Sequence, residues 1–126
     1  MKEHGIQNEI RNALAGQCLL FRANVGQAWA GDVTKLPGNR VVIDNARPFN
    51  TGLPPGFADL FGLVSVEITP DMVGKKVAIF TALEVKTSTG RASSKQTDFL
   101  QAVANNGGRS GVVRSAADAL NVIRGE

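Results

Sequence analysis

Glu84 and Lys86 are the residues whose types and spacing most clearly indicate chemistry. They lie two apart at the end of the apolar run "VAIFTALEVK", directly before the loop "TSTGRAS". Because side chains alternate along a strand, both point to one face near its carboxyl end. Burying charge is costly unless the charge is paired or bound. The spacing fits either a simple ion pair or a carboxylate and an amine that act on a ligand.

A second carboxylate, Asp59, follows the Pro/Gly turn of "PPGFADLFG" and opens the preceding apolar run. If the two runs form neighbouring strands, Asp59 and Glu84 can converge on one cation. Hard divalent ions such as Mg²⁺ take carboxylate and carbonyl oxygens. Such an ion would polarise a phosphoryl oxygen and help generate hydroxide, while Lys86 orients the water. The alternative is that Asp59 only hydrogen-bonds to its own turn.

Other kinds of site are excluded by the residues the chain lacks. It has no Gly-x-x-x-x-Gly-Lys-[Ser/Thr] run, so the phosphate cradle of a P-loop is absent. His4 and Cys18 are its only histidine and cysteine, too few for a zinc site with three or four protein ligands. A Ser-His-Asp or Cys-His device would depend on His4 beside the terminus, where an exposed helix residue is the simpler interpretation.

Length and composition predict one domain over residues 1–126. The chain is 43% apolar and 20% charged, which is ordinary for a globular protein. We expect no membrane segment, because no apolar stretch approaches about 20 residues. The single Cys18 and the polar start favour a reducing, cytoplasmic setting. The net charge is +3, which permits a nucleic-acid partner without requiring one.

The periodicity of apolar residues predicts eight elements that would position these side chains. Most of residues 26–55 is predicted as loop, with a short strand at 40–43, because Gly and Pro repeatedly break the pattern. The strand at 77–87 is apolar enough to be covered on both faces. The remaining predictions are helices at 3–15, 94–105 and after Ser115, and strands at 18–25, 57–68 and 110–114. The strand–helix–strand ending implies a parallel pair, so the fold class is α/β or α+β with helices around a mixed central sheet.

Taken together, these motifs resemble the virus-type replication-repair nuclease (VRR-NUC) family, a branch of the PD-(D/E)xK nucleases. That family's pattern is a glutamate on the first helix, G-x-x-D, E-x-K on a strand, a Ser-x-x-Gln helix, a Gly-rich turn and V-x-R-S. Here it is similar to "GFAD", "LEVK", "SSKQ", "NNGG" and "VVRS", in that order. The resemblance extends from Glu3 to Leu120 and is weakest at 26–55. It implies a restriction-endonuclease-like fold and metal-dependent DNA cleavage.

Site residues follow from that resemblance position by position. Asp59, Glu84 and the main-chain carbonyl of Val85 would bind Mg²⁺ or Mn²⁺, and Lys86 would orient the water. Gln96, from Ser-x-x-Gln, would support the site from the next helix. The first-helix acid would be Glu3, with Glu9 as the alternative; stabilising a helix N-terminus is the other interpretation of Glu3.

The resemblance also implies partners. Small stand-alone members of the family act as dimers on four-way junctions, so we expect branched DNA, a homodimer and a bacteriophage protein in the host cytoplasm. Residues 75–126 carry eight basic and four acidic side chains, which are either solvated surface or phosphate contacts. Trp29 either stacks on a base or anchors its loop in the core. A non-catalytic DNA-binding module that keeps the nuclease fold is the competing function. The residues expected to contact DNA are Arg91, Lys95, Arg109 and Arg114.

Overall fold

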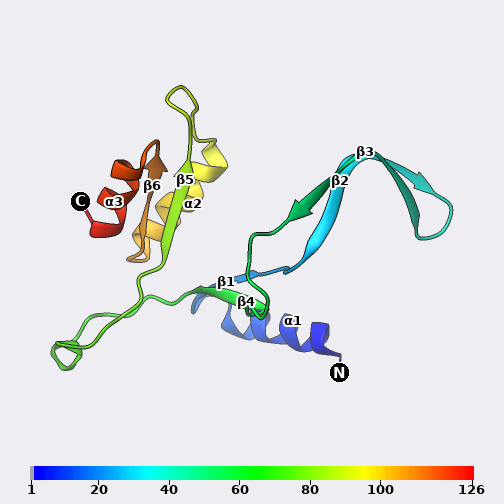
Figure 1. Cartoon of the computed structure of the whole chain (residues 1–126). Helices are drawn as coiled ribbons and strands as arrows, with labels where there is room; N and C mark the ends of the chain where they lie inside the picture. The colour runs from blue at the N-terminus through cyan, green and yellow to red at the C-terminus, as the bar shows by residue number, and fades with distance from the viewer. Residues whose placement is uncertain (1) are drawn as a thin grey trace. The chain divides into compact units, whose positions relative to one another are not determined.

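A computed structural model describes residues 2–126 of the chain (Figure 1). The chain divides into two compact units, and each is described by itself. The first contains the residues up to Ala13 together with Leu20–Phe61, and the second contains Leu14–Leu19 together with Gly62–Glu126. One domain over residues 1–126 stays a prediction. No helix among residues 2–126 is long and apolar enough to cross a membrane.

The first unit begins with helix α1 (Glu3–Leu14), which confirms the helix predicted at this end of the chain. Strand β1 (Leu19–Arg22) follows and pairs with β4 (Leu60–Leu63). The ring centroids of Phe21 and Phe61 lie 5.6 Å apart, and those of Phe57 and Phe61 lie 5.3 Å apart. These aromatic contacts hold the turn before Asp59 against β1.

Residues 26–55 are not mostly loop, and this prediction was wrong. They form a long antiparallel hairpin of β2 (Gln27–Leu36) and β3 (Arg40–Asn50), seen at the right of Figure 1. Its turn places Gly38 at φ 79°, where glycine is strongly favoured. Pro48 is tolerated because both strands of a two-stranded ribbon are edges. The glycine and proline that suggested a loop therefore lie in the hairpin turn and in an edge strand.

The hairpin contains a β-bulge, and Trp29 lies just before it on β2. The register shifts between Ala30 and Asp32, where Asn45 adopts a φ of 55°, as expected of a β-bulge with an extra residue in β3. Trp29 lies on β2 opposite Pro48, and its side chain is 60% exposed. It is therefore not an anchor in a core.

The second unit is built around a parallel pair, β5 (Thr81–Val85) and β6 (Arg109–Val113), joined by α2 (Ser94–Asn105). The predicted strand–helix–strand ending is thereby confirmed. Helix α3 (Ala116–Arg124) follows β6. Figure 1 shows α2 and α3 on opposite sides of this pair. Val103 of α2 and Val113 of β6, exposed by 0% and 3%, form the buried core among residues 2–126.

Two strand predictions in this unit were too long. Residues 64–68 and 77–80 lie outside any strand. All of them except Glu67 line a common apolar pocket, together with Met72 of the short 3₁₀ helix Pro70–Met72. The expectation that both faces of the 77–87 strand are covered was also wrong. Leu83 is 40% and Val85 73% exposed, because α3 packs mainly on β6 rather than on β5.

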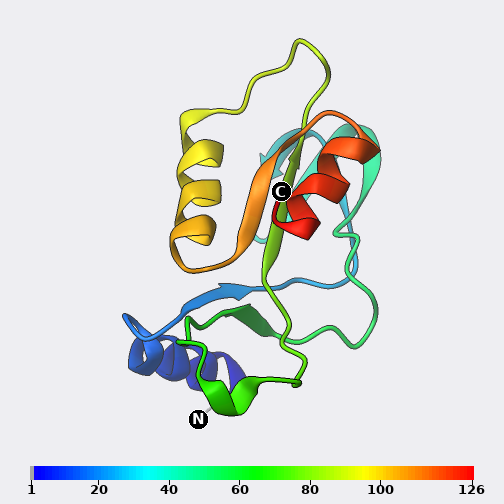
Figure 2. The same cartoon turned by 90° about the vertical axis from the view of Figure 1, so that its left-hand side faces the viewer.

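The fold class is α+β, as predicted. The strands form three two-stranded sheets rather than one continuous central sheet in the described structure. The part of this fold that matters most for function is the second unit, in which α2 lies beside the parallel pair of β5 and β6 (Figure 2). These elements position three of the predicted site residues.

Candidate active site at the end of strand β5

Glu84 lies on the face of β5 that looks toward α2, and Lys86, the first residue after the strand, contacts it. The Nζ of Lys86 lies 3.2 Å from the Oε1 of Glu84. The side chain of Lys86 is 23% exposed and that of Glu84 is 29% exposed, so both are partly accessible to solvent. The main-chain N–H of Lys86 donates to the carbonyl of Val113, 3.0 Å away on β6. This bond fixes the strand end from which Lys86 projects.

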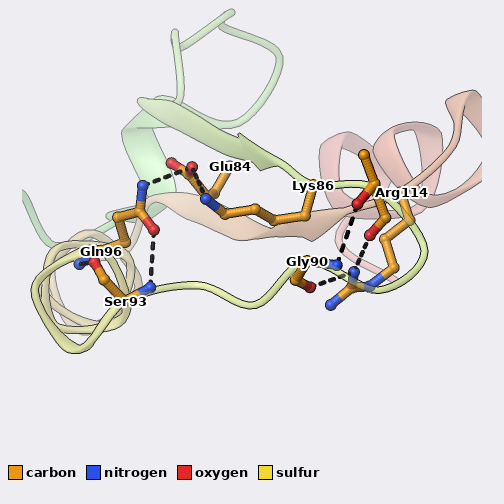
Figure 3. A network of polar contacts seen from close by, with 7 residues as sticks. Glu84, Lys86, Gly90, Ser93, Gln96 and Arg114 are labelled. Carbon is orange, nitrogen blue, oxygen red and sulfur yellow. Dashed lines mark hydrogen bonds and ion pairs between the residues drawn. The ribbon is translucent and has the colours of Figure 1, made fainter.

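Helix α2 brings Gln96 to the same carboxylate. Its Nε2 donates to the Oε1 of Glu84 at 2.8 Å (Figure 3). Gln96 occupies the first turn of α2, where it completes a capping box with the N-cap residue Ser93. The N–H of Gln96 donates to the Oγ of Ser93 at 3.1 Å, and the N–H of Ser93 donates to the Oε1 of Gln96 at 2.9 Å. Local helix chemistry thus sets the position of Gln96.

Arg114, at the end of β6, holds the loop that follows Lys86. Its guanidinium donates to the carbonyl of Gly90 at 2.7 Å and also to that of Thr87 (Figure 3). The main-chain N–H of Arg114 donates to Asp118 of α3 at 2.8 Å. Both bonds come from one nitrogen, Nη1, whose two N–H groups can serve two acceptors at once. Arg114 therefore fixes the loop that follows Lys86 through intramolecular hydrogen bonds.

The other predicted site residues lie elsewhere in the molecule. Asp59 is exposed and belongs to the first unit, where its carbonyl accepts from the N–H of Ala23 at 3.0 Å. Glu3 is exposed in the first turn of α1, and Glu9 is exposed further along the same helix. That Asp59 or either glutamate joins Glu84 stays a prediction, because the two units are not placed relative to each other.

The residues predicted to contact DNA differ in what they already bind. Arg91 and Lys95 are exposed, and no hydrogen bond or ion pair engages their side chains within residues 2–126. The guanidinium of Arg109 donates to the carbonyl of Ile123 near the end of α3. Arg109 and Arg114 therefore both have intramolecular partners, and phosphate contacts by these four residues stay a prediction.

The donor set around Glu84 is chemically suited to a hard divalent cation, though it is incomplete in the second unit alone. Both neighbours contact one oxygen, Oε1, which leaves Oε2 without either of these contacts. Carboxylate and main-chain carbonyl oxygens, as Glu84 and Val85 supply here, are the ligands Mg²⁺ prefers. Within the part of the chain that the structure describes, no three His, Cys, Asp or Glu side chains come together. A further acid would have to come from elsewhere.

Two roles were missed by reading the sequence. Ser93 was placed before the helix without a function, although Ser-x-x-Gln is the sequence signature of a capping box and would have identified it. Arg114 was read only as a possible phosphate contact. No local signal could have revealed its bonds to Thr87 and Gly90, because they join residues 24 or more apart in the chain.

Glu84, Lys86 and Gln96 thus come together in the arrangement that the sequence resemblance predicted, at the end of a strand and on the next helix. The model of one protein family, described as the VRR-NUC domain, matches residues 40–117. This is more than half of the chain, and the chain belongs to the VRR-NUC family, which has a restriction-endonuclease-like fold. No curated protein and no solved structure gives a significant match. The family establishes a nuclease domain that processes DNA.

Proposed function

We propose that this chain is a divalent-metal-dependent endonuclease that hydrolyses phosphodiester bonds in branched DNA such as four-way junctions. The observation that carries the proposal is the cluster of Glu84, Lys86 and Gln96, held within 3.2 Å contacts at one strand end. Carboxylate, amine and amide are the groups that metal-assisted hydrolysis needs for ion binding, water orientation and support. The cluster lies inside the segment that matches the nuclease family.

The residues take different roles in this proposal. Glu84, Asp59 and the main-chain carbonyl of Val85 hold Mg²⁺ or Mn²⁺. When bound, such an ion neutralises the carboxylates, polarises a phosphoryl oxygen and lowers the pKa of water. The ammonium of Lys86 donates to the attacking water and orients it toward phosphorus. Gln96 holds the Glu84 carboxylate in place through its NH₂ group.

The same proposal covers the first helix, the DNA and the assembly. Glu3 assists through water from α1. Arg91, exposed in the loop that follows Lys86, and Lys95, exposed in the first turn of α2, contact phosphates together with Arg109 and Arg114. A four-way junction has two-fold symmetry, and two equivalent cuts need two equivalent sites, so the active form is a homodimer. A bacteriophage enzyme acting in the host cytoplasm would meet such junctions.

Cleavage of end-labelled four-way junctions, compared with linear duplex, tests the proposal. With Mg²⁺ or Mn²⁺ we expect cuts in the junction, and with EDTA none. Lys86→Ala should lower the cleavage rate by about 100-fold or more, as expected when the group that orients a reactant is lost. Lys76→Ala is the matched control, because Lys76 is an exposed lysine of the same unit outside the site. Equal cleavage by both variants would refute the role of Lys86.

A second substitution tests the metal ligands. Asp59→Asn keeps the size of the side chain and removes its charge, so it should abolish metal-dependent cutting while the melting temperature stays unchanged. Because the side chain of Asp59 is exposed, the substitution should not impair folding. Lost activity would therefore reflect the loss of the carboxylate. If wild type binds junctions tightly but no metal supports cutting, the chain is a non-catalytic DNA-binding module that keeps the nuclease fold.

A further inference from the structure

Gln96 uses both ends of its side-chain amide, and the two ends serve different structures. Its Oε1 accepts from the N–H of Ser93 at 2.9 Å, which belongs to the cap of α2. Its Nε2 donates to the Oε1 of Glu84 at 2.8 Å, which belongs to the proposed active site. Figure 3 shows these two contacts running from the main-chain nitrogen of Ser93 through the Gln96 amide to the Glu84 carboxylate. The helix cap and the site therefore share one amide group.

Because the Gln96 amide contacts both Ser93 and Glu84, only one of its ends can face the Glu84 carboxylate. A carboxamide has one acceptor end and one donor end. If the amide turned over, its oxygen would face the carboxylate of Glu84 and its NH₂ would face the N–H of Ser93, which gives two repulsive contacts. A glutamate in place of Gln96 would complete the cap but present a second carboxylate to Glu84. Only a glutamine satisfies both partners.

We propose that Ser93 is a positioning residue of the nuclease site, acting through Gln96 on Glu84. This inference rests on the proposed function. Ser93 contributes twice: its Oγ accepts from the N–H of Gln96 at 3.1 Å, and its own N–H holds the Gln96 oxygen. Both bonds fix the first turn of α2. The Glu84 carboxylate is thereby oriented before any ligand binds.

The rest of α2 is held independently of this cap, which confines the effect to the site. Val103 is fully buried, and the Oγ of Ser110 on β6 donates to the carbonyl of Leu100 at 2.7 Å. Loss of the cap should therefore fray the first turn while the later turns stay packed. Gln96 lies in that first turn, so its amide is released from Glu84.

The chain offers a matched control for the loss of a cap. Ser115 caps α3, and its Oγ accepts from the N–H of Asp118 at 3.1 Å, the same distance as at Ser93. Ser93→Ala and Ser115→Ala each remove one such bond and should each lower the melting temperature by about 3–5 °C. Ser93→Thr retains the hydroxyl. Ser93→Pro also removes the main-chain N–H. The φ of Ser93 is −69°, a value that proline adopts.

Two measurements separate positioning from stability. The first is the NMR signal of the Gln96 side-chain NH₂ in metal-free protein, assigned by its loss in Gln96→Ala. We expect Ser93→Ala to move this signal toward the position of a free amide, Ser93→Pro to move it further, and Ser93→Thr to restore it. The second is Mn²⁺ titration, in which Ser93→Ala should weaken binding about tenfold. Ser115→Ala should leave both unchanged.

The two measurements distinguish a failure of the proposed function from a failure of the positioning role of Ser93. If wild type neither binds Mn²⁺ nor cuts DNA, the proposed function falls, and the NH₂ signal still reports whether Ser93 controls Gln96. If wild type binds and cuts, but both Ser93→Ala and Ser93→Pro match Ser115→Ala in the NH₂ signal and in Mn²⁺ affinity, the positioning role of Ser93 is overturned and the function stands.

Discussion

Gln96→Glu separates the two tasks of this residue in a single substitution. Glutamate at the third helical position completes a capping box as well as glutamine does, and a negative charge in the first turn is favourable for a helix. The cap of α2 should therefore persist. The donor to Glu84 disappears, and a second carboxylate takes its place beside the first.

The size of the effect follows from the contact. Hydrogen bonds to charged groups contribute about 1.5–3 kcal/mol, and the 29% exposure of Glu84 favours the lower end of that range. Since about 1.4 kcal/mol corresponds to a factor of ten in rate, losing the donor costs roughly tenfold. Repulsion between the carboxylates adds to this loss, and the Lys86 ammonium, 3.2 Å from Oε1, offsets part of it. We expect cleavage to fall by about 10- to 100-fold.

The assay is single-turnover cleavage of a four-way junction at saturating Mg²⁺, beside thermal unfolding without metal. The melting temperature should fall by no more than about 2 °C. Gln101→Glu is the control, because it makes the same change on the same helix, where the Gln101 amide bonds to Asn105 instead. Cleavage within twofold of wild type for Gln96→Glu would refute the role of the shared amide.

Two further predictions concern the frame around the site. Arg114→Ala removes the Nη1 that donates to the carbonyls of Thr87 and Gly90, so amide exchange at Gly90, followed by NMR, should accelerate about tenfold; unchanged exchange would contradict the role of Arg114 in holding this loop. Gly108→Ala would place a Cβ 2.6 Å from a methyl carbon of Val103, and overpacking of this kind typically costs about 1–3 kcal/mol. The melting temperature should then drop by about 5–10 °C, and an unaltered value would show that the core can adjust.

The predictions from sequence were most accurate where capping residues and the helical periodicity of apolar residues agree. The helix over Ser94–Asn105 has its predicted bounds, and Ser115 caps α3 by accepting from Asp118. Both depend on interactions within one turn, which local sequence encodes. The parallel arrangement of β5 and β6 also followed, because a helical crossover between two strands leaves them pointing the same way.

The hairpin at 27–50 could not be predicted in the same way. Its strands include glycine and proline, and their pairing depends on a turn at Gly38 and a bulge at Asn45. Glycine and proline weaken a local strand signal, whereas the partner strand supplies the missing stability. The overlong prediction for 77–87 has the converse cause: apolar residues such as Val85 signal burial, yet whether a face is covered depends on where α3 packs.

By itself, the sequence determined the candidate chemistry: Glu84 and Lys86 must share a face because strand side chains alternate, and their spacing with Gln96 matches a nuclease pattern. Only the tertiary structure decided that Gln96 and Lys86 meet the same carboxylate oxygen and that Ser93 orders the amide between them. Gln96 reaches Glu84 across 12 residues of chain. Such a contact depends on how α2 packs on its sheet, which no local pattern encodes.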